Sequence, residues 1–270
     1  MTPFAVSPLS DEPRIRGYLL TDAAYAAYAL ADLEPPYSAS ATWTVATRDA
    51  VIEGLALLYD ALEPPALFLM GSLPAAEALL RQPIGPERVL FMCQPHLIPA
   101  VRTAYNVGAT SEMLRMRLAP AGFSPAHPDR SPTPRRLTAS DVPAMRRLLV
   151  EAAAHDERAL DDIAFTPLMV ESGIYCGIDS GDALVAMAGT HVIAPRAGLA
   201  ALGNVAVHPQ HRRRGLATAV SGAVTRALFD MGLQAVYLNV RRDNAAAMRV
   251  YRRLGFQTVA AFVEGIATER

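Results

Sequence analysis

The turn between residues 207 and 216 carries residue types that suit binding of a phosphate. An apolar segment, 202–207, is typical of a buried strand that stops at Pro209, and from Leu216 onward apolar residues recur at helical spacing. The start of a helix gathers unpaired backbone N–H groups and the positive end of the helix dipole around one point. Charge and close backbone approach come from Arg212, Arg213, Arg214 and Gly215. We therefore predict an anion site at this turn.

A second segment places two polar side chains on one helix face. Asn244 follows residues 235–240, an apolar stretch typical of a buried strand, and the spacing after it predicts a helix to about Leu254. Tyr251 lies seven residues after Asn244, which is close to two helical turns. The two side chains are therefore expected on the same side of this helix.

Together, these segments resemble the two acyl-CoA half-sites of the GNAT superfamily of N-acyltransferases. The first matches R-x-x-G-x-A at residues 212–217, and the second matches N-x-x-A-x-x-x-Y-x-x-x-G-F at residues 244–256. The motifs cover about 199–257, and a looser resemblance extends over 136–265. The resemblance implies that acetyl-CoA is the co-substrate and that acetyl is transferred directly to a primary amine of a small molecule.

The resemblance also implies a role for each site residue. The amides of Val205 and Val207 face the pantetheine arm and the thioester carbonyl, where an N–H group stabilises an oxyanion. Asn244 contacts the pantetheine arm, and Tyr251 protonates the departing CoA thiolate. The pyrophosphate is bound by Arg212, Arg213, Arg214, Gly215, Leu216 and Ala217.

The general base is the least defined part of the site. Many relatives use a glutamate on the strand before the phosphate turn, and the corresponding residue here, Ala201, cannot accept a proton. We favour His191, because an imidazole with a pKa near 6.5 suits a base near neutral pH and its strand borders the site. His208, Glu264 and Asn204, the last as a water-positioning group, remain alternatives.

Proline content predicts the domain organisation. Five prolines between residues 120 and 134 favour an extended linker, which we place at 119–136. Residues 137–270 then form a GNAT acetyltransferase domain, and residues 1–118 repeat its element order. After residues 68–70 the first half lacks an R-x-x-G-x-A motif, so it resembles the degenerate first domain of two-domain GNAT proteins. We expect an α/β (α+β) fold of two units, each with a mixed, mostly antiparallel sheet flanked by helices.

Periodicity and turn residues predict the individual elements. In the first half, a helix is expected within 14–33 and further helices at 73–81 and 97–105, and the expected strands are 42–46, 51–59, 65–70, 88–92 and 113–118. In the second half, the expected helices are 140–154, 216–231 and 244–254, and the expected strands are 136–138, 174–178, 183–193, 199–207, 235–240 and 256–264.

Composition narrows the class of protein. A net charge of −1 gives no global reason to expect nucleic acid or membrane as a partner, and the two cysteines form no C-x-x-C pair, so we expect no metal site. We expect a cytoplasmic monomer or homodimer without a leader or membrane span. Residues 211–254 contain nine arginines and two acids, which the CoA phosphates explain. The alternatives are a non-catalytic acyl-CoA-binding or sensing protein and a nucleic-acid-binding protein that uses this arginine-rich face.

Overall fold

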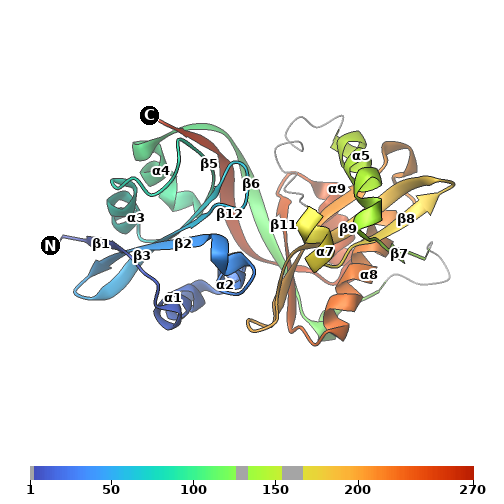
Figure 1. Cartoon of the computed structure of the whole chain (residues 1–270), viewed down its shortest axis with the longest axis horizontal. Coiled ribbons are helices and arrows are strands. Elements are labelled where there is room, and N and C mark those ends of the chain that lie inside the picture. Colours follow the sequence, from blue (N-terminus) through green and yellow to red (C-terminus); the bar gives the residue numbers. More distant parts are fainter. Residues whose placement is uncertain (1–2, 126–132, 154–166) are drawn as a thin grey trace. The chain divides into compact units, whose positions relative to one another are not determined.

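The chain divides into two compact units that are discontinuous in sequence. The computed structural model describes residues 3–125, 133–153 and 167–270. Unit 1 comprises Met1–Arg115, Arg241–Asp243 and Val259–Arg270, and unit 2 comprises Met116–Val240 and Asn244–Thr258. Both units are of mixed α/β type with mostly antiparallel strands, as expected from the sequence (Figure 1).

Unit 1 is built on strands in the order β1-β2-β3-β4-β5-β12-β6. Their bounds are β1 Ala5–Pro8, β2 Ala41–Arg48, β3 Val51–Tyr59, β4 Ala66–Gly71, β5 Arg88–Cys93, β6 Tyr105–Leu118 and β12 Gln257–Glu269. The hairpin of β2 and β3 turns at Asp49 and Ala50, both with positive φ, as the polar turn residues predict. Strands β4 and β5 are parallel, which requires the crossover helix α3, Leu73–Leu80, between them.

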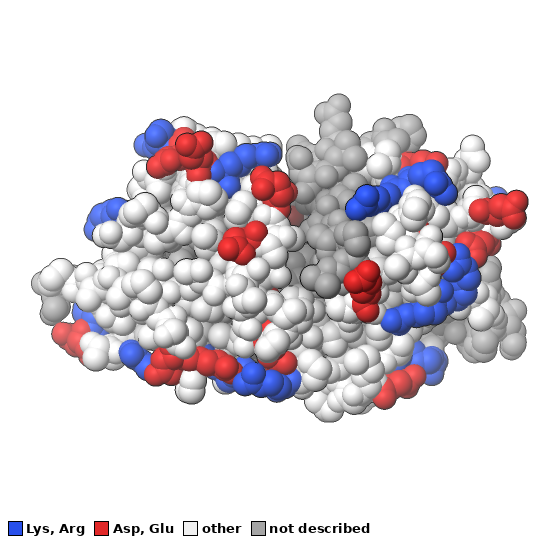
Figure 2. Space-filling view, in the orientation of Figure 1, with Lys and Arg blue, Asp and Glu red and all other residues white. Residues whose placement is uncertain are grey.

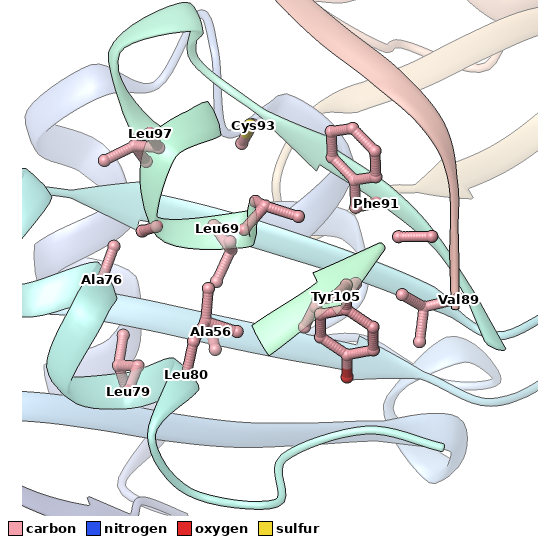
Figure 3. Close-up of a cluster of buried hydrophobic side chains, with 14 of the residues drawn as sticks. Ala56, Leu69, Ala76, Leu79, Leu80, Val89, Phe91, Cys93, Leu97 and Tyr105 are labelled. Carbon is pink, nitrogen blue, oxygen red and sulfur yellow. The ribbon is translucent and has the colours of Figure 1, made fainter. Parts of the chain in front are cut away.

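The core of unit 1 forms where α3 and α4, Ile98–Ala104, pack on the sheet (Figure 3). Leu79 from α3, Leu69 from β4 and Phe91 from β5 are fully buried there. The region 14–33, where one helix is expected, contains parts of two: α1, Glu12–Leu19, and α2, Ala27–Ala31, with a 3-10 turn between them. The Asp22 side chain accepts a hydrogen bond from the Tyr25 amide, a local contact that competes with a continuous helix.

The end of the chain belongs to unit 1, which differs from the expected division at 119–136. Strand β12 pairs antiparallel with β5 from Val263 opposite Cys93 to Thr268 opposite Arg88. This pairing satisfies backbone groups of β5 that would otherwise form a free sheet edge. Of the expected linker, residues 126–132 lie outside the described residues, and its last two residues form β7, Arg135–Arg136.

Unit 2 has the strand order β11-β10-β9-β8-β7. Beyond β7, the strands are β8 Cys176–Ser180, β9 Ala183–Ala194, β10 Leu199–Val207 and β11 Ala235–Arg241. The helices are α5 Val142–Ala153, α7 Pro167–Ser172, α8 Leu216–Asp230 and α9 Ala245–Leu254. Figure 1 shows α5 and α7 on one face of this sheet and α8 on the other. The expected strands around residues 176–207 and the helices that follow are confirmed.

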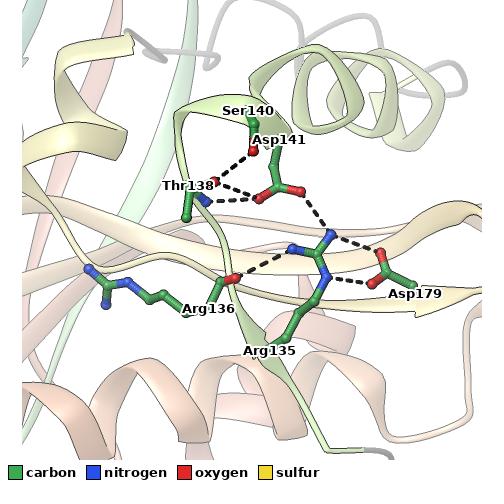
Figure 4. Close-up of polar contacts among 6 residues, drawn as sticks. All are labelled: Arg135, Arg136, Thr138, Ser140, Asp141 and Asp179. Carbon is green, nitrogen blue, oxygen red and sulfur yellow. Dashed lines mark hydrogen bonds and ion pairs between the residues drawn. The ribbon is translucent and has the colours of Figure 1, made fainter.

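A charged cluster ties β7 to the start of α5 (Figure 4). Arg135 donates to Asp179 on β8 at 2.5 Å and to Asp141 at 2.8 Å. Asp141 also accepts from the Thr138 amide in a capping box just before α5. Because these groups are partly solvated, the ion pairs add little stability, and their main effect is to set where α5 begins.

Candidate active site

Strands β10 and β11 pair over only part of their length. Among the described residues their parallel register joins Leu199–Ala201 to Ala235–Tyr237. Strand β10 then continues to Val207 while still paired with β9 on its other side. Beyond Ala201, β10 therefore pairs with β9 at one backbone edge, and its other edge extends past the residues that pair with β11.

Two irregularities in the β9–β10 ladder shape this region. Between Gly203 and Ala206, β10 has one more residue than β9, and Asn204 in this bulge has φ +51. Between Ala201 and Leu202, the extra residue is on β9 and is His191. Bulges bend a strand and redirect its side chains. The predicted base His191 and its alternative Asn204 are therefore the two bulged residues of one strand pair.

The alternation of hydrogen bonds gives the direction of the β10 amides. The His208 amide donates to Val185 O at 2.9 Å, which continues the antiparallel ladder past the end of β10. Successive residues of a strand direct their backbone groups to opposite edges. Val207, and Val205 two residues before it, therefore direct their N–H groups away from β9. The Val207 carbonyl points the same way and accepts from Arg212 Nε at 3.4 Å.

The turn after β10 leads into α8 through two left-handed residues. Arg213 has φ +63 and Gly215 has φ +78, a conformation that favours glycine. Gly215 is the N-cap of α8, and no side chain caps the helix there. The first backbone amides of α8 are therefore available to bind an anion. Leu216 is buried and Ala217 is partly exposed.

The three arginines of the turn are not equivalent. Arg212 donates from its guanidinium to the Ala152 carbonyl near the end of α5 at 2.9 Å, so it ties the turn to α5. Arg213 and Arg214 are exposed and extend from the turn itself. Three arginine side chains are predicted to extend from this turn toward the phosphate. In the structure, Arg213 and Arg214 extend from it, and Arg212 contacts α5.

Asn244 and Tyr251 lie on α9 as the spacing predicts. The Asn244 Oδ1 accepts from the Ala247 amide at 3.0 Å and caps the helix, which leaves its NH₂ group as a donor. Tyr251 is 7% exposed and its ring lies 6.0 Å from that of Phe256. Burial raises the pKa of Tyr251 to about 12. Its phenol is therefore protonated at neutral pH and can donate a proton.

His191 has the electrostatic environment of a neutral base. Burial lowers its pKa from the ordinary 6.5, and a hydrogen bond with Asn204 opposes part of that shift. Its Nε2 atom is buried and has no hydrogen-bond partner among the described residues. The ring lies against Gly203, where a Cβ would come within 2.1 Å of Nε2. At neutral pH this imidazole is uncharged and retains a basic nitrogen.

The other residues considered for the base have different surroundings. Ala201 is fully buried in β10. His208 accepts from the Gln210 amide through Nδ1, and its Nε2 lies 3.7 Å from the Glu151 carboxylate. Glu264 belongs to unit 1, where it is paired with Met92 of β5. His191 is thus the candidate whose buried nitrogen has no protein partner among the described residues.

Sequence reasoning did not identify Tyr175 as part of this region. Its hydroxyl donates to the Thr190 carbonyl at 3.0 Å and accepts from Asn204 Nδ2 at 3.0 Å. A single tyrosine before a strand carries no spacing signal. Only the register that pairs Gly189 with Gly203 shows that there is room for its ring.

Unit 1 has a different arrangement at the corresponding strand pair. Strand β4 ends at Gly71, and no R-x-x-G-x-A motif follows before α3. The hydroxyl of Tyr25, a fully buried residue, donates to the Leu69 carbonyl at 2.8 Å and lies 3.5 Å from the Met92 carbonyl. A side chain of the protein thus bridges the two parallel strands of unit 1.

Two features are absent from the described part of the chain. No three His, Cys, Asp or Glu side chains there are grouped so that they could hold a metal ion. No described helix combines the length and apolar character needed to cross a membrane.

The second half of the chain is similar to known acetyltransferases. Residues 142–256 match the profile of the Acetyltransferase (GNAT) family. Over 60 residues, the chain is 45% identical to a mycothiol acetyltransferase of Saccharomonospora viridis, a match that spans 22% of this chain and 20% of that protein.

Solved structures resemble the chain over nearly its whole length. A GCN5-related N-acetyltransferase from Sphaerobacter thermophilus matches with TM-score 0.62 and 18% identity over 99% of this chain and 96% of its own. A tandem GNAT protein from the clavulanic acid biosynthesis pathway matches with TM-score 0.55 and 16% identity over 98% of each chain. At these identities the likeness concerns the fold, and a layout of two GNAT-like units is consistent with it. In this chain, the match to the Acetyltransferase (GNAT) family is confined to residues 142–256.

Proposed function

We propose that this protein transfers acetyl from acetyl-CoA to a primary amine of a small molecule. The observation that carries the proposal is the combination of the diverging β10 and β11 with the uncapped N-terminus of α8 in a GNAT domain. At the turn before α8, backbone amides and arginine side chains can bind phosphates. Along β10, backbone amides and the His191 imidazole can contact a thioester. We place the reaction in the cytoplasm, where both buried cysteines stay reduced.

Binding relies on backbone groups more than on side chains. The α8 amides with Arg213 and Arg214 hold the pyrophosphate, while Arg212 acts through its contact with α5. The Asn244 NH₂ group donates to the pantetheine arm. The N–H groups of Val205 and Val207 line the path of that arm, and one of them stabilises the thioester oxyanion. In the first turn of α8, the Leu216 side chain is buried and the Ala217 side chain is small, so both leave space for the pyrophosphate.

His191 and Tyr251 carry the proton transfers. His191 accepts a proton from the amine as its nitrogen bonds to the thioester carbon. Tyr251 donates a proton to the CoA sulfur as the carbon–sulfur bond breaks, so one proton leaves nitrogen and one reaches sulfur. Solvent restores both residues. With its pKa raised to about 12, the Tyr251 phenol is protonated at neutral pH, and transfer of its proton to sulfur depends on its position beside the departing thiolate.

The test of this proposal uses two glycines at opposite ends of one helix. Gly215 before α8 and Gly232 after it both have positive φ, +78 and +86. A Cβ at Gly232 would meet nothing within 4 Å. We expect Gly215→Val to weaken acetyl-CoA binding at least about tenfold by calorimetry, because it blocks backbone approach to the anion. Gly232→Val carries the same backbone strain and should bind as the wild type does.

Transfer itself is measured as thiol release with a panel of primary amines. Amine-dependent release supports the acetyltransferase, and unchanged acetyl-CoA binding by Gly215→Val would contradict the site. Ala201 at the position of the family's glutamate favours one second candidate, a non-catalytic acyl-CoA sensor. Tight binding without turnover on the whole panel would support that candidate instead.

The nucleic-acid alternative has weaker support. Figure 2 shows basic and acidic side chains interspersed on the face in view. Arg212 is engaged with α5, so part of the arginine excess in residues 211–254 is structural. Nucleic acid binding with a steep salt dependence, together with no acetyl-CoA binding, would favour this alternative.

A further inference from the structure

Helix α9 ends in a backbone motif that includes the residue proposed as the acid. The Gly255 amide donates to the Arg252 carbonyl at 3.0 Å, and the Phe256 amide donates to the Tyr251 carbonyl at 3.0 Å. Gly255 has φ +103. Two nested hydrogen bonds around a left-handed residue define a Schellman motif, which satisfies carbonyls that the end of a helix leaves without partners. The backbone of Tyr251 is therefore bonded to the second residue beyond the helix.

The same motif places the Phe256 side chain against the ring of Tyr251. The two ring centroids are 6.0 Å apart and the ring planes meet at 65°, which is an edge-to-face geometry. A Schellman motif commonly brings these two positions into apolar contact, and here both residues are aromatic. Phe256 is 2% exposed and Tyr251 is 7% exposed. Phe256 thus contacts Tyr251 both through its backbone amide and through its ring.

The turn that carries Phe256 is held in place by the segment that follows β6. The Ser124 amide donates to the Leu254 carbonyl at 3.0 Å, which is the last residue of α9. The Gly122 carbonyl lies against Gly255, where a Cβ would approach its oxygen within 2.0 Å. These contacts are all within unit 2. A displacement of Phe256 would therefore disturb both the end of α9 and the segment packed on it.

The orientation of the Tyr251 phenol depends on this packing. Burial is the cause of the raised pKa of Tyr251, and no charged group among the described residues contributes to that shift. A phenol can protonate a thiolate only within hydrogen-bond distance, and a displacement of about 1 Å can lower a rate about a hundredfold. The contact with Phe256 is therefore expected to affect the proton transfer.

We propose that Phe256 is a positioning residue that holds the Tyr251 phenol where it can protonate the CoA sulfur. This inference rests on the role of Tyr251 in the proposed acetyl transfer. It assigns separate roles to the last two residues of the second sequence motif. Gly255 permits the left-handed turn, and Phe256 fixes the tyrosine ring. Phe256 acts through Tyr251 and itself transfers no proton.

A double-mutant cycle tests this role. Phe256→Leu keeps an apolar side chain and removes the ring. With an amine found in the panel, we expect kcat to fall at least about tenfold while the Kd for acetyl-CoA changes less than about twofold. In a Tyr251→Phe background, the same substitution should change kcat less than about twofold, because no phenol remains to be positioned. Equal losses of kcat in the two backgrounds would show a general structural effect and overturn the proposal.

Phe91→Leu is the matched control for loss of a buried ring. Phe91 is fully buried in the core of unit 1, whereas the proposed site lies in unit 2. This variant should keep the wild-type kcat, and a loss equal to that of Phe256→Leu would contradict a specific role of Phe256. Where circular dichroism shows that Phe256→Leu does not fold, Phe256→Met retains a flexible apolar contact with the ring and enters the same cycle.

The Tyr251 ring can also be observed without any substrate. Relaxation measurements on the full-length protein with ¹³C-labelled tyrosine report how fast each ring rotates, and a Tyr251→Phe variant identifies the Tyr251 signal. We expect Phe256→Leu to speed rotation of the Tyr251 ring and to leave the buried Tyr105 of unit 1 unchanged. An unchanged rotation rate would overturn the positioning role and leave acetyl transfer intact. Absence of acetyl-CoA binding would overturn the transferase and with it the role of Tyr251 as its acid.

Discussion

At the scale of single residues, burial separates the two proposed proton carriers. Tyr251 is buried and His191 is partly exposed, and for both groups desolvation disfavours the charged form. For the phenol this raises the pKa to about 12 and preserves the acid. For the imidazole it lowers the pKa below 6.5 and preserves the base. Burial thus keeps both the Tyr251 phenol and the His191 imidazole uncharged at pH 7.

Removal of the phenol oxygen tests the acid directly. We expect Tyr251→Phe to lower kcat by about a hundredfold, because CoA then leaves as an unprotonated thiolate. The Kd for acetyl-CoA should change less than about twofold, since the ring still packs against Phe256. Steady-state thiol release and calorimetry give the two values. An unchanged kcat would remove Tyr251 from the mechanism.

At the scale of elements, the proposed site is formed by the ends of strands and helices. Strand β10 contributes backbone where its pairing with β11 stops, and α8 contributes the amides of an uncapped N-terminus. Helix α9 differs, because Asn244 caps it and Gly255, with φ +103, ends it. A Cβ on Gly255 would lie 2.0 Å from the Gly122 carbonyl, which explains the glycine that closes the second motif.

Asn244 caps α9, and substitution can separate this structural role from the binding role that we propose for it. Asn244→Ala should lower the free energy of unfolding by about 1 kcal/mol through loss of the cap, and it should weaken acetyl-CoA binding. Asn244→Ser keeps a capping oxygen but has no NH₂ group, so it should retain most of the stability and still bind acetyl-CoA more weakly. Urea unfolding and calorimetry measure the two effects. Full affinity in Asn244→Ser would show that the residue is only a cap.

At the scale of the whole molecule, each half is completed by distant parts of the chain. The last residues of the sequence add a strand to unit 1, where Ala267 is fully buried opposite Val89. The acetyl-CoA site proposed above lies in unit 2. In unit 1, the Tyr25 hydroxyl contacts the Leu69 carbonyl of β4 and the Met92 carbonyl of β5, the two parallel strands of that unit.

A charge at Ala267 tests whether the chain end stabilises unit 1. We expect Ala267→Asp to lower the free energy of unfolding by roughly 3 kcal/mol, because a buried carboxylate there has no partner. Trp43, the only tryptophan, lies in β2 and reports on unit 1 by fluorescence during urea unfolding. Thr268→Asp, at the exposed neighbouring position, is the matched control and should unfold as the wild type does. Equal midpoints for the two variants would contradict this role of β12.

The sequence by itself determined the features that depend on neighbours along the chain. The turn at residues 212–215, the helix from Asn244 to Leu254 and most strand positions follow from local periodicity, capping and glycine conformations. The break at Asp22 was missed because one side-chain hydrogen bond outweighed an alanine-rich helical pattern.

Only the tertiary structure decided which distant residues meet. No local pattern reveals that Gly189 pairs with Gly203, because strand register depends on bulges and long-range packing. That register brings Tyr175, Asn204 and His191 together. The pairing of β12 with β5 could not be predicted for the same reason. A strand pattern predicts an extended segment with hydrogen-bonding groups at both edges, but it does not predict which strand will pair with them.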